Sequence, residues 1–346
     1  MNQSIHQIYN YNAQNMHHIN DNSIDLVVTS PPYPMIEMWD ELYKHLNPQI
    51  TKHLSEGDGQ NAFELMHREL DIIWEEIYRV VKNNRFICIN IGDATRTINK
   101  NFMIYFNHSR IINKMLSLGF QPLPTIYWRK QTNAPNKFMG SGMLPAGAYV
   151  TLENEFILIF RKGGKREFKS LQEKELRMNS AFFWEERNKW FSDIWDVKGT
   201  NQRIINSKSR ERSAAFPFEI PYRLINMYSI KGDTILDPFL GIGTTTLAAL
   251  ASNRNSIGIE LNNDLIPIVN KNISSSKDRL NQYILKRLED HCQFIDNYEH
   301  KKQPKYYNDF LKNKVITKQE TKIKLDILDD IIIEDEKIIA IYKEIE

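Results

Sequence analysis

The sequence contains little cysteine and no long apolar run. Its two cysteines in 346 residues are Cys88 and Cys292, which lie far apart without the spacing of metal ligands. We therefore expect neither a disulfide framework nor a zinc site, and no metal. No stretch approaches the roughly 18 apolar residues of a membrane span, and the N-terminus lacks the basic start and apolar run of a signal peptide. These absences predict a cytoplasmic protein without a membrane segment.

The chain also lacks a marked excess of either charge. Its formal net charge is +2, and its 41% hydrophobic and 25% charged residues are ordinary for a soluble globular protein. One segment departs from this balance, because residues 161–212 carry 14 Lys and Arg against 8 Asp and Glu. Aromatic residues are interleaved with these charges at Phe182, Phe183, Trp184 and Trp190. The pattern predicts contact with nucleic acid, and a solvated charged insertion is the alternative.

The stretch DLVVTSPPYP, residues 25–34, places a short predicted strand directly before two prolines. Its apolar LVV is typical of a buried strand. Pro31 and Pro32 cannot donate to a sheet, so the strand ends before them and a rigid turn follows. Ligands bind at the carboxyl ends of strands in open α/β sheets, which makes Ser30 to Tyr33 candidate site residues. A proline-terminated strand without a further role is the alternative.

Two strand–helix halves flank the basic segment and predict an α/β fold. Apolar spacing and turn residues in the first half predict helix 63–81, strand 83–93, a helix ending near Gly119, and strands 124–130 and 154–162. The second half is predicted to contain helix 217–229, strand 233–239, a glycine turn opening helix 241–252, and strand 255–261. The tail has mixed charges and helical periodicity, so we expect a peripheral helical appendage there.

The stretch ILDPFLGIGTTTLAALASNRNSIGIEL, residues 235–261, carries the pattern of a nucleoside site. Gly241 and Gly243 permit a tight turn with close approach of the backbone to a ligand, and Thr244 begins the helix that follows. Glu260 lies about 20 positions past the turn, at the end of the next strand, where a carboxylate can bind the two hydroxyls of a ribose. A purely structural turn is the alternative.

Asp237 and Thr246 distinguish between nucleoside cofactors. A dinucleotide site favours a third small residue where this chain has Thr246, and an acidic Asp237 would repel a pyrophosphate. The same carboxylate could help to hold an ammonium group, directly or through water. S-adenosylmethionine offers both an ammonium group and a ribose, whereas NAD has no ammonium group. We therefore favour S-adenosylmethionine and keep a dinucleotide-dependent oxidoreductase as a remoter alternative.

Together these motifs resemble those of the amino-group DNA methyltransferases. SPPY at 30–33 is similar to their catalytic motif and DPFLGIGT at 237–244 to their cofactor motif. Their order, with a basic variable segment between them, resembles the β class, and the chain is most like the cytosine-N4-specific enzymes of restriction-modification systems. The resemblance runs from about residue 8 to 275. It implies a Rossmann-like sheet with helices on both faces, S-adenosyl-L-methionine as cofactor and double-stranded DNA as substrate.

The resemblance also implies how the catalytic residues act. Ser30 Oγ and the Pro31 carbonyl oxygen would accept the two N–H bonds of an exocyclic amine, which localises its lone pair for in-line methyl transfer. Tyr33 would supply a stacking face and Pro32 would keep the turn rigid. The target base must be flipped out of the duplex to reach them. Stacking is worth about 1–3 kcal/mol toward that extrusion.

Further site residues are assigned by the resemblance. Cofactor contacts are expected from Asp237, Phe239, Gly241, Gly243, Thr244, Glu260, Phe216, Pro217 and Asn12, the last standing where the family often has Asp. DNA contacts are expected from Trp128, Lys130, Arg203, Lys208, Arg210 and Arg212, the last standing where the family often has His. Trp190 or a neighbour is a candidate to wedge into the duplex.

The choice of base rests on the first motif residue. Family members with Ser there are mostly cytosine-N4 enzymes and those with Asp are mostly adenine-N6 enzymes, so cytosine-N4 is favoured and adenine-N6 is the alternative. Carbon-5 methylation is disfavoured, because it needs an activated thiol and both cysteines are expected to be packing residues. A non-catalytic DNA-binding paralogue is a remoter alternative.

We expect four parts along the chain. They are a catalytic half at 1–160, a target-recognition segment at 161–212, the cofactor half of the same domain at 213–280, and a helical appendage at 281–346. The resemblance also implies a genetic pairing with a restriction endonuclease. It leaves the DNA recognition sequence and the oligomeric state open.

Overall fold

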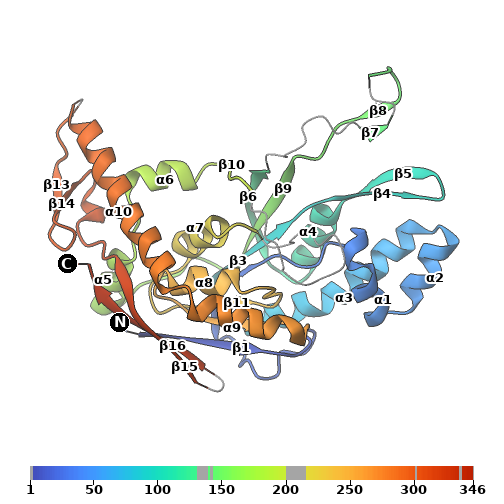
Figure 1. Ribbon diagram of the computed structural model, residues 1–346, viewed down its shortest axis with the longest axis horizontal. Helices are drawn as coiled ribbons and strands as arrows, with labels where there is room; N and C mark the ends of the chain where they lie inside the picture. Colours follow the sequence, from blue (N-terminus) through green and yellow to red (C-terminus); the bar gives the residue numbers. More distant parts are fainter. Residues whose placement is uncertain are drawn as a thin grey trace.

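The computed structural model describes residues 3–130, 139–140, 143–199, 216–300, 302–334 and 337–345. One large sheet dominates this part of the chain (Figure 1). Its centre consists of five parallel strands, in spatial order β3 (Val81–Ile91), β2 (Ile24–Thr29), β11 (Thr234–Asp237), β12 (Asn255–Ile259) and β1 (Gln3–Tyr9). The two motif-bearing strands, β2 and β11, are therefore direct neighbours.

Antiparallel strands extend the sheet on both sides. Next to β3 lie β9 (Asn154–Lys162), β6 (Gln121–Arg129) and, parallel to β6, β10 (Ile194–Asp196). Next to β1 lie β16 (Lys337–Glu344) and β15 (Asp326–Glu334). Because β9 is antiparallel to β3, it begins at the edge of the sheet where the parallel strands end.

Helices cover both faces of the sheet (Figure 1). One face packs on α1 (Asp40–Leu46), α2 (Gln49–Glu56), α3 (Gly59–Val80) and α4 (Asn107–Ser117), and the other on α7 (Glu219–Tyr228), α8 (Thr244–Leu250), α9 (Ile266–Ser274) and α10 (Lys277–Glu299). In β2, Val27 packs in the core between the sheet and α1 to α4, while Leu26 and Val28 pack in the core between the sheet and α7 to α10. Successive strand side chains point to opposite faces, so the middle of a strand covered on both sides is apolar on both faces.

The structure confirms the α/β class and the helices and strands predicted for both halves. The predicted helix ending near Gly119 is α4, and Gly119 follows it with φ +93°. The expected boundary after residue 160 falls within β9, and the one after 280 falls within α10. Within the described ranges, no helix combines the length and the apolar character that a bilayer span requires.

Two hairpins that the sequence did not predict project from the same side of the molecule (Figure 1). They are β4 (Ala94–Ile98) with β5 (Asn101–Tyr105), and β7 (Met139–Gly140) with β8 (Ala148–Tyr149). The rings of Phe102 and Tyr149 stack with centroids 4.8 Å apart, which joins the two hairpins.

The aromatic residues of the basic segment pack mostly inward. The segment contains α5 (Leu171–Asn179) and α6 (Trp184–Trp190). Phe183 is fully buried and stacks on His291 of α10, with 3.8 Å between ring centroids. Trp190 is also buried. This burial argues against a DNA wedge at Trp190 itself, because its ring packs α6 onto the helical layer. The neighbouring Trp184 is 38% exposed, so a wedge formed by a neighbour stays a prediction.

The expectation of a wholly helical appendage is wrong. After α10 the chain forms the small hairpin β13 (Tyr306–Asn308) and β14 (Asn313–Val315), and then β15 and β16 join the main sheet. In β16, Ile338, Ala340 and Tyr342 are buried at alternate positions. This period of two, with many β-branched isoleucines, favours a strand, and β1 offers an edge for β16 to pair with.

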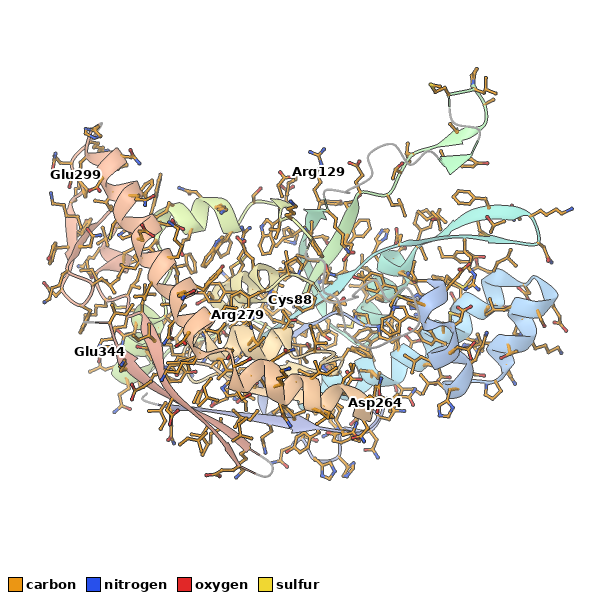
Figure 2. All side chains as sticks on the ribbon, viewed as in Figure 1. Cys88, Arg129, Asp264, Arg279, Glu299 and Glu344 are labelled. Carbon is orange, nitrogen blue, oxygen red and sulfur yellow. The ribbon has the colours of Figure 1, made fainter. Side chains whose placement is uncertain are left out.

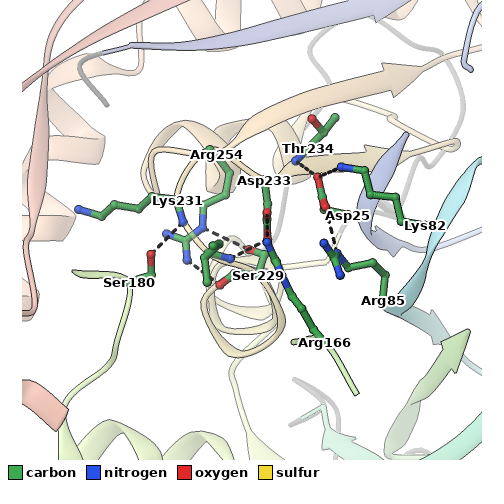
Figure 3. Close-up of polar contacts among 12 residues, drawn as sticks. Asp25, Lys82, Arg85, Arg166, Ser180, Ser229, Lys231, Asp233, Thr234 and Arg254 are labelled. Carbon is green, nitrogen blue, oxygen red and sulfur yellow. Dashed lines mark hydrogen bonds and ion pairs between the residues drawn. The ribbon is translucent and has the colours of Figure 1, made fainter. Parts of the chain in front are cut away.

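Ion pairs hold the amino ends of the central strands together (Figure 3). Asp25 in β2 accepts from Lys82 at 2.8 Å and from Arg85 at 3.0 Å, both in β3. Asp233, just before β11, accepts twice from Arg166, at 2.5 and 3.0 Å. Charged groups thus occupy this edge, and both sequence motifs lie at the opposite, carboxyl edge.

Replacing Tyr342 with Phe should destabilise the protein without impairing its chemistry. The buried hydroxyl contacts Ser4 Oγ and donates to the Leu250 carbonyl, both at 2.8 Å. Losing these partners should lower the free energy of unfolding by about 1–3 kcal/mol, as measured by chemical denaturation. Tyr307, which is about half exposed, provides the matched control in Tyr307→Phe. Equal stability of the two variants would show that the Tyr342 hydroxyl does not stabilise the packing of the β15–β16 hairpin.

Candidate active site

The two motifs meet at the carboxyl edge of the sheet. The SPPY turn follows β2, and the DPF turn follows β11, its neighbour. Thr29 Oγ1 donates to Asp237 Oδ1 at 2.6 Å, and both side chains are buried. This bond joins the last residue of β2 to the last residue of β11. The predicted catalytic and cofactor halves are therefore held together directly at the site.

Hydrogen bonds to its backbone hold the SPPY turn in place. Tyr43 Oη donates to the Pro32 carbonyl at 2.6 Å, and Asn107 Nδ2 donates to the Pro34 carbonyl at 3.1 Å. Asn107 in turn accepts from His67 at 2.9 Å, and burial lowers the pKa of His67 to about 3, so its ring is neutral. Within the described part of the chain no donor is bound to the Pro31 carbonyl, which leaves this oxygen able to accept.

A polar cluster not predicted from the sequence surrounds Ser30 and Tyr33. Tyr33 Oη lies 3.2 Å from Ser30 Oγ and donates to Glu155 Oε2 at 2.8 Å. Asn90 Nδ2 donates to Tyr33 Oη at 2.8 Å and to Glu155 Oε2 at 2.7 Å. Burial and the charge of Glu155 raise the pKa of Tyr33 well above its ordinary value, so the phenol remains a donor.

The position of these two partners follows from the sheet. Asn90 is near the end of β3, and Glu155 is the second residue of β9, which starts at the carboxyl edge. The signal available in the sequence was Glu155 at the head of the apolar run NEFILIF. Its meaning depends on β9 running antiparallel to β3, which periodicity alone does not reveal.

The glycine turn after β11 has the predicted geometry. Gly241 and Gly243 have φ of +56° and +88°, in the left-handed region that favours glycine. A Cβ on Gly243 would lie 3.1 Å from Val269 Cγ1, so the packing against α9 also restricts this position. Thr244 then begins α8. The turn exposes backbone for a close approach to a ligand, as a nucleoside site requires.

Glu260 closes this turn from the neighbouring strand. It directly follows β12, and its Oε2 accepts from the Gly241 N–H at 2.8 Å while Oε1 accepts from the Asn262 N–H at 2.8 Å. Burial raises the pKa of Glu260 above its ordinary value. Each oxygen has a further lone pair, so the carboxylate can still accept from hydroxyl groups of a ribose. These free acceptor positions fit the ribose hydroxyls of the expected cofactor.

Asp237 has a more structural position than expected. Besides the bond from Thr29, its carboxylate accepts from Thr245 Oγ1 at 2.6 Å and from the Phe239 N–H at 3.1 Å. Burial raises its pKa. Three donors from the chain already surround it, so its main role is to position the strand ends, and contact with an ammonium group stays a prediction.

The remaining predicted cofactor residues lie around the same edge. Asn12 follows β1, but its Oδ1 already accepts from the Gln14 N–H at 2.9 Å. Phe216 and Pro217 are buried just before α7, and Phe216 belongs to the core between the sheet and α7 to α10. Phe239 packs edge-on to Trp74 at 6.1 Å between ring centroids. Their contacts with the cofactor stay predictions.

Two of the six predicted DNA contacts, Trp128 and Lys130, lie in the part of the chain that the structure describes. Trp128 is 1% exposed and donates to the Val197 carbonyl at 2.8 Å, so it packs in the core rather than facing DNA, contrary to the prediction. Lys130 is about half exposed and lies 2.5 Å from Glu155 Oε1, which ties it to the polar cluster. Four predicted contacts lie outside the described residues: Arg203, Lys208, Arg210 and Arg212.

Neither cysteine is placed for nucleophilic chemistry. Cys88 lies in the interior of the molecule, within β3 (Figure 2). Burial raises the pKa of its thiol well above the ordinary value. Cys292 lies in α10, where burial also raises its pKa. A buried or raised-pKa thiol is a poor nucleophile, which agrees with the expectation that both residues pack.

Known proteins match this chain in sequence. A family model described as DNA methylase (N6_N4_Mtase) matches residues 24–271. The chain is 52% identical over 322 residues to the Type II methyltransferase M.MthZI of Methanothermobacter thermautotrophicus, covering 92% of this chain and 90% of that protein. It is 50% identical over 286 residues to the Type II methyltransferase M.MjaI of Methanocaldococcus jannaschii, covering 80% and 93%.

Solved structures share the fold. A DNA modification methylase of Thermus thermophilus, TTHA0409, in complex with S-adenosyl-L-methionine, matches with a TM-score of 0.59 and 26% identity, covering 80% of this chain and 93% of that one. The PvuII DNA methyltransferase matches with a TM-score of 0.52 and 16% identity, covering 77% and 86%. The family match and the complexed structure identify S-adenosyl-L-methionine as the cofactor.

Replacing Glu260 with Gln should weaken cofactor binding and leave DNA binding intact. The amide keeps the size of the side chain but loses the charge and one acceptor. Charge-assisted hydrogen bonds are worth about 1.5–3 kcal/mol, so the dissociation constant for S-adenosyl-L-methionine should rise roughly 10- to 100-fold, as measured by calorimetry. Asp264→Asn, at an exposed carboxylate nearby (Figure 2), is the control. An unchanged constant in Glu260→Gln would remove this residue from the site.

Proposed function

Because the chain belongs to the DNA methylase family, we propose that it methylates the exocyclic N4 amine of cytosine in double-stranded DNA. The single observation that supports the chemistry is the juxtaposition at the carboxyl edge. Two acceptors, Ser30 Oγ and the Pro31 carbonyl, lie in the turn after β2, which is the strand beside β11 and its glycine turn. The bond from Thr29 to Asp237 joins the ends of these two strands.

These acceptors address the difficulty of the reaction. The lone pair of an exocyclic amine is delocalised into the ring of the base, so the amine is a poor nucleophile. Acceptance of its two N–H bonds by Ser30 and Pro31 localises that pair on nitrogen and aims it. S-adenosyl-L-methionine supplies the methyl group. In the transfer the amine nitrogen would bond to the methyl carbon while the carbon–sulfur bond breaks and leaves its electron pair on sulfur. The proton that the nitrogen loses would pass to water.

The target base must leave the duplex to reach Ser30, and we propose that it is flipped into the site against the ring of Tyr33. Gly92 supports this geometry, since a Cβ there would lie 3.0 Å from Tyr33 Cε2. The ring can therefore rest directly against the backbone after β3. Replacing Gly92 with any residue that has a Cβ would push the ring of Tyr33 out of place.

Cytosine is favoured over adenine because Ser30, rather than Asp, begins the motif. Adenine N6 is the second candidate, since the family model covers methylases of both amines. We further propose that residues 161–212 recognise the target and that Lys130, Arg203, Lys208, Arg210 and Arg212 contact DNA. By analogy with the Type II methyltransferases M.MthZI and M.MjaI, pairing with a restriction endonuclease is also proposed.

Nucleoside mass spectrometry tests the proposal. Plasmid DNA is incubated with the protein and S-adenosyl-L-methionine carrying a labelled methyl group, then digested to nucleosides. We expect label in N4-methylcytosine, and Ser30→Ala should reduce it about 100-fold while binding the cofactor normally, because the hydroxyl acts on the amine. Label in N6-methyladenine would overturn the choice of base. Label in 5-methylcytosine, or none with the wild-type protein, would overturn the chemistry.

A further inference from the structure

The polar cluster at the carboxyl edge contains a buried carboxylate that the chemistry above does not use. Glu155 is 9% exposed and Asn90 is 2% exposed, and both contact the hydroxyl of Tyr33. Lys130 occupies the other oxygen of Glu155 at 2.5 Å. A buried carboxylate is stable only when donors surround it, and Glu155 has three, Tyr33, Asn90 and Lys130. Two hydrogen bonds, through Tyr33 Oη, connect it to Ser30 Oγ, so it can influence how Ser30 acts.

The chemical nature of each group determines the direction of every bond. A carboxylate only accepts, so the single hydrogen of Tyr33 Oη points to Glu155 Oε2, 2.8 Å away. The nitrogen of Asn90, not its oxygen, must face the same carboxylate at 2.7 Å. With its own hydrogen committed, Tyr33 Oη can only accept from its other neighbours, among them Ser30 Oγ at 3.2 Å.

The hydroxyl hydrogen of Ser30 is therefore drawn toward Tyr33. Asn90 Nδ2 lies 3.5 Å from Ser30 Oγ, but its two hydrogens are already donated to Tyr33 Oη and Glu155 Oε2. The lone pairs of Ser30 Oγ are therefore left to accept from a group outside the cluster. A serine hydroxyl can otherwise rotate and donate, and a donated hydrogen would oppose an N–H of the target amine.

We propose that Glu155 is a positioning residue that orients the hydroxyl of Ser30, through Tyr33, so that Ser30 presents a lone pair to the target amine. Ser30 is neutral, and this chain of bonds converts a group that can donate or accept into one that accepts. The inference rests on the proposed role of Ser30 and holds whether the amine belongs to cytosine or adenine. It gives Tyr33 a second role besides stacking.

Single-turnover methyl transfer at saturating cofactor and DNA tests the inference in Glu155→Gln and Tyr33→Phe. The glutamine amide can donate to Tyr33, which reverses the chain, and Phe keeps the stacking ring but removes the link. Each variant should slow transfer about 100-fold, while the dissociation constants for S-adenosyl-L-methionine and DNA change less than about twofold. Glu153→Gln, at an exposed carboxylate two residues away, should match the wild type.

A double-mutant cycle separates positioning from a general structural role. If Glu155 acts through Tyr33, the double variant Glu155→Gln/Tyr33→Phe should be no slower than the slower single variant. Adding Glu155→Gln to Ser30→Ala should likewise have no further effect, because the end of the chain is already missing. Multiplying effects in either pair, or a wild-type rate in Glu155→Gln, would overturn the inference.

The Ser30→Ala variant distinguishes this failure from failure of the proposed function. A slow Ser30→Ala with a fast Glu155→Gln overturns the positioning role alone, whereas a fast Ser30→Ala overturns the role of Ser30 itself. Should Glu155→Gln not fold, as judged by its thermal midpoint, Tyr33→Phe decides the matter. A wild-type rate in Tyr33→Phe would overturn the chain on its own, because no other bond links Glu155 to Ser30 through a hydroxyl in the described residues.

Discussion

The buried carboxylate of Asp237 is the interaction on which the site depends. It accepts from Thr29 at the end of β2, from Thr245 in α8 and from the N–H of Phe239. Thr29 lies more than 200 residues before Asp237 and the other two donors, and they meet because β2 and β11 are paired in the sheet. A carboxylate buried with three donors tolerates little displacement, so the catalytic turn and the cofactor turn keep a fixed relation.

The rest of the fold serves this juxtaposition. At the amino ends of the same strands, Asp25 and Asp233 form ion pairs that hold the sheet together. At the carboxyl ends, strand direction decides which side chains meet. Parallel strands deliver the SPPY and DPF turns, and antiparallel β9 delivers Glu155 from its first residues. The proposed site thus combines the glycine turn after β11, the two candidate acceptors of the SPPY turn and a buried carboxylate, from elements distant in the sequence.

The sequence predicted those parts of the fold that depend on local patterns. Runs of apolar residues indicated β2 and β11, and two closely spaced glycines indicated the turn before α8. Each of these patterns lies within a few consecutive residues. The hairpin of β15 and β16 was mistaken for helix, since mixed charges obscured a period of two that only matters once β1 offers an edge. Trp128 was expected to face DNA because its stretch YWRK resembles the aromatic segment that lies near the target base in the family. In the structure its indole donates to the Val197 carbonyl and lies in the core.

The candidate site shows the same division between local and distant information. Ser30, Gly241 and Glu260 could be found because their motifs are contiguous or separated by one strand–helix–strand unit. Asn90 and Glu155 could not be found from the sequence, because they approach Tyr33 only through the pairing of β3 with β9. No local sequence pattern indicates that pairing. Long-range polar contacts of this kind follow from topology, so they become visible only in the folded chain.

We infer that Asp237 couples the SPPY turn to the glycine turn, and two isosteric variants separate its two bonds. Thr29→Val removes the donor on β2, while Thr245→Val removes the donor on α8, and both leave the carboxylate in place. The measurement is the single-turnover rate of methyl transfer alongside the calorimetric dissociation constant for S-adenosyl-L-methionine. We expect Thr29→Val to slow transfer more than it weakens cofactor binding, and Thr245→Val to weaken cofactor binding more than it slows transfer. Transfer at the wild-type rate in Thr29→Val, in a protein that remains folded, would contradict it.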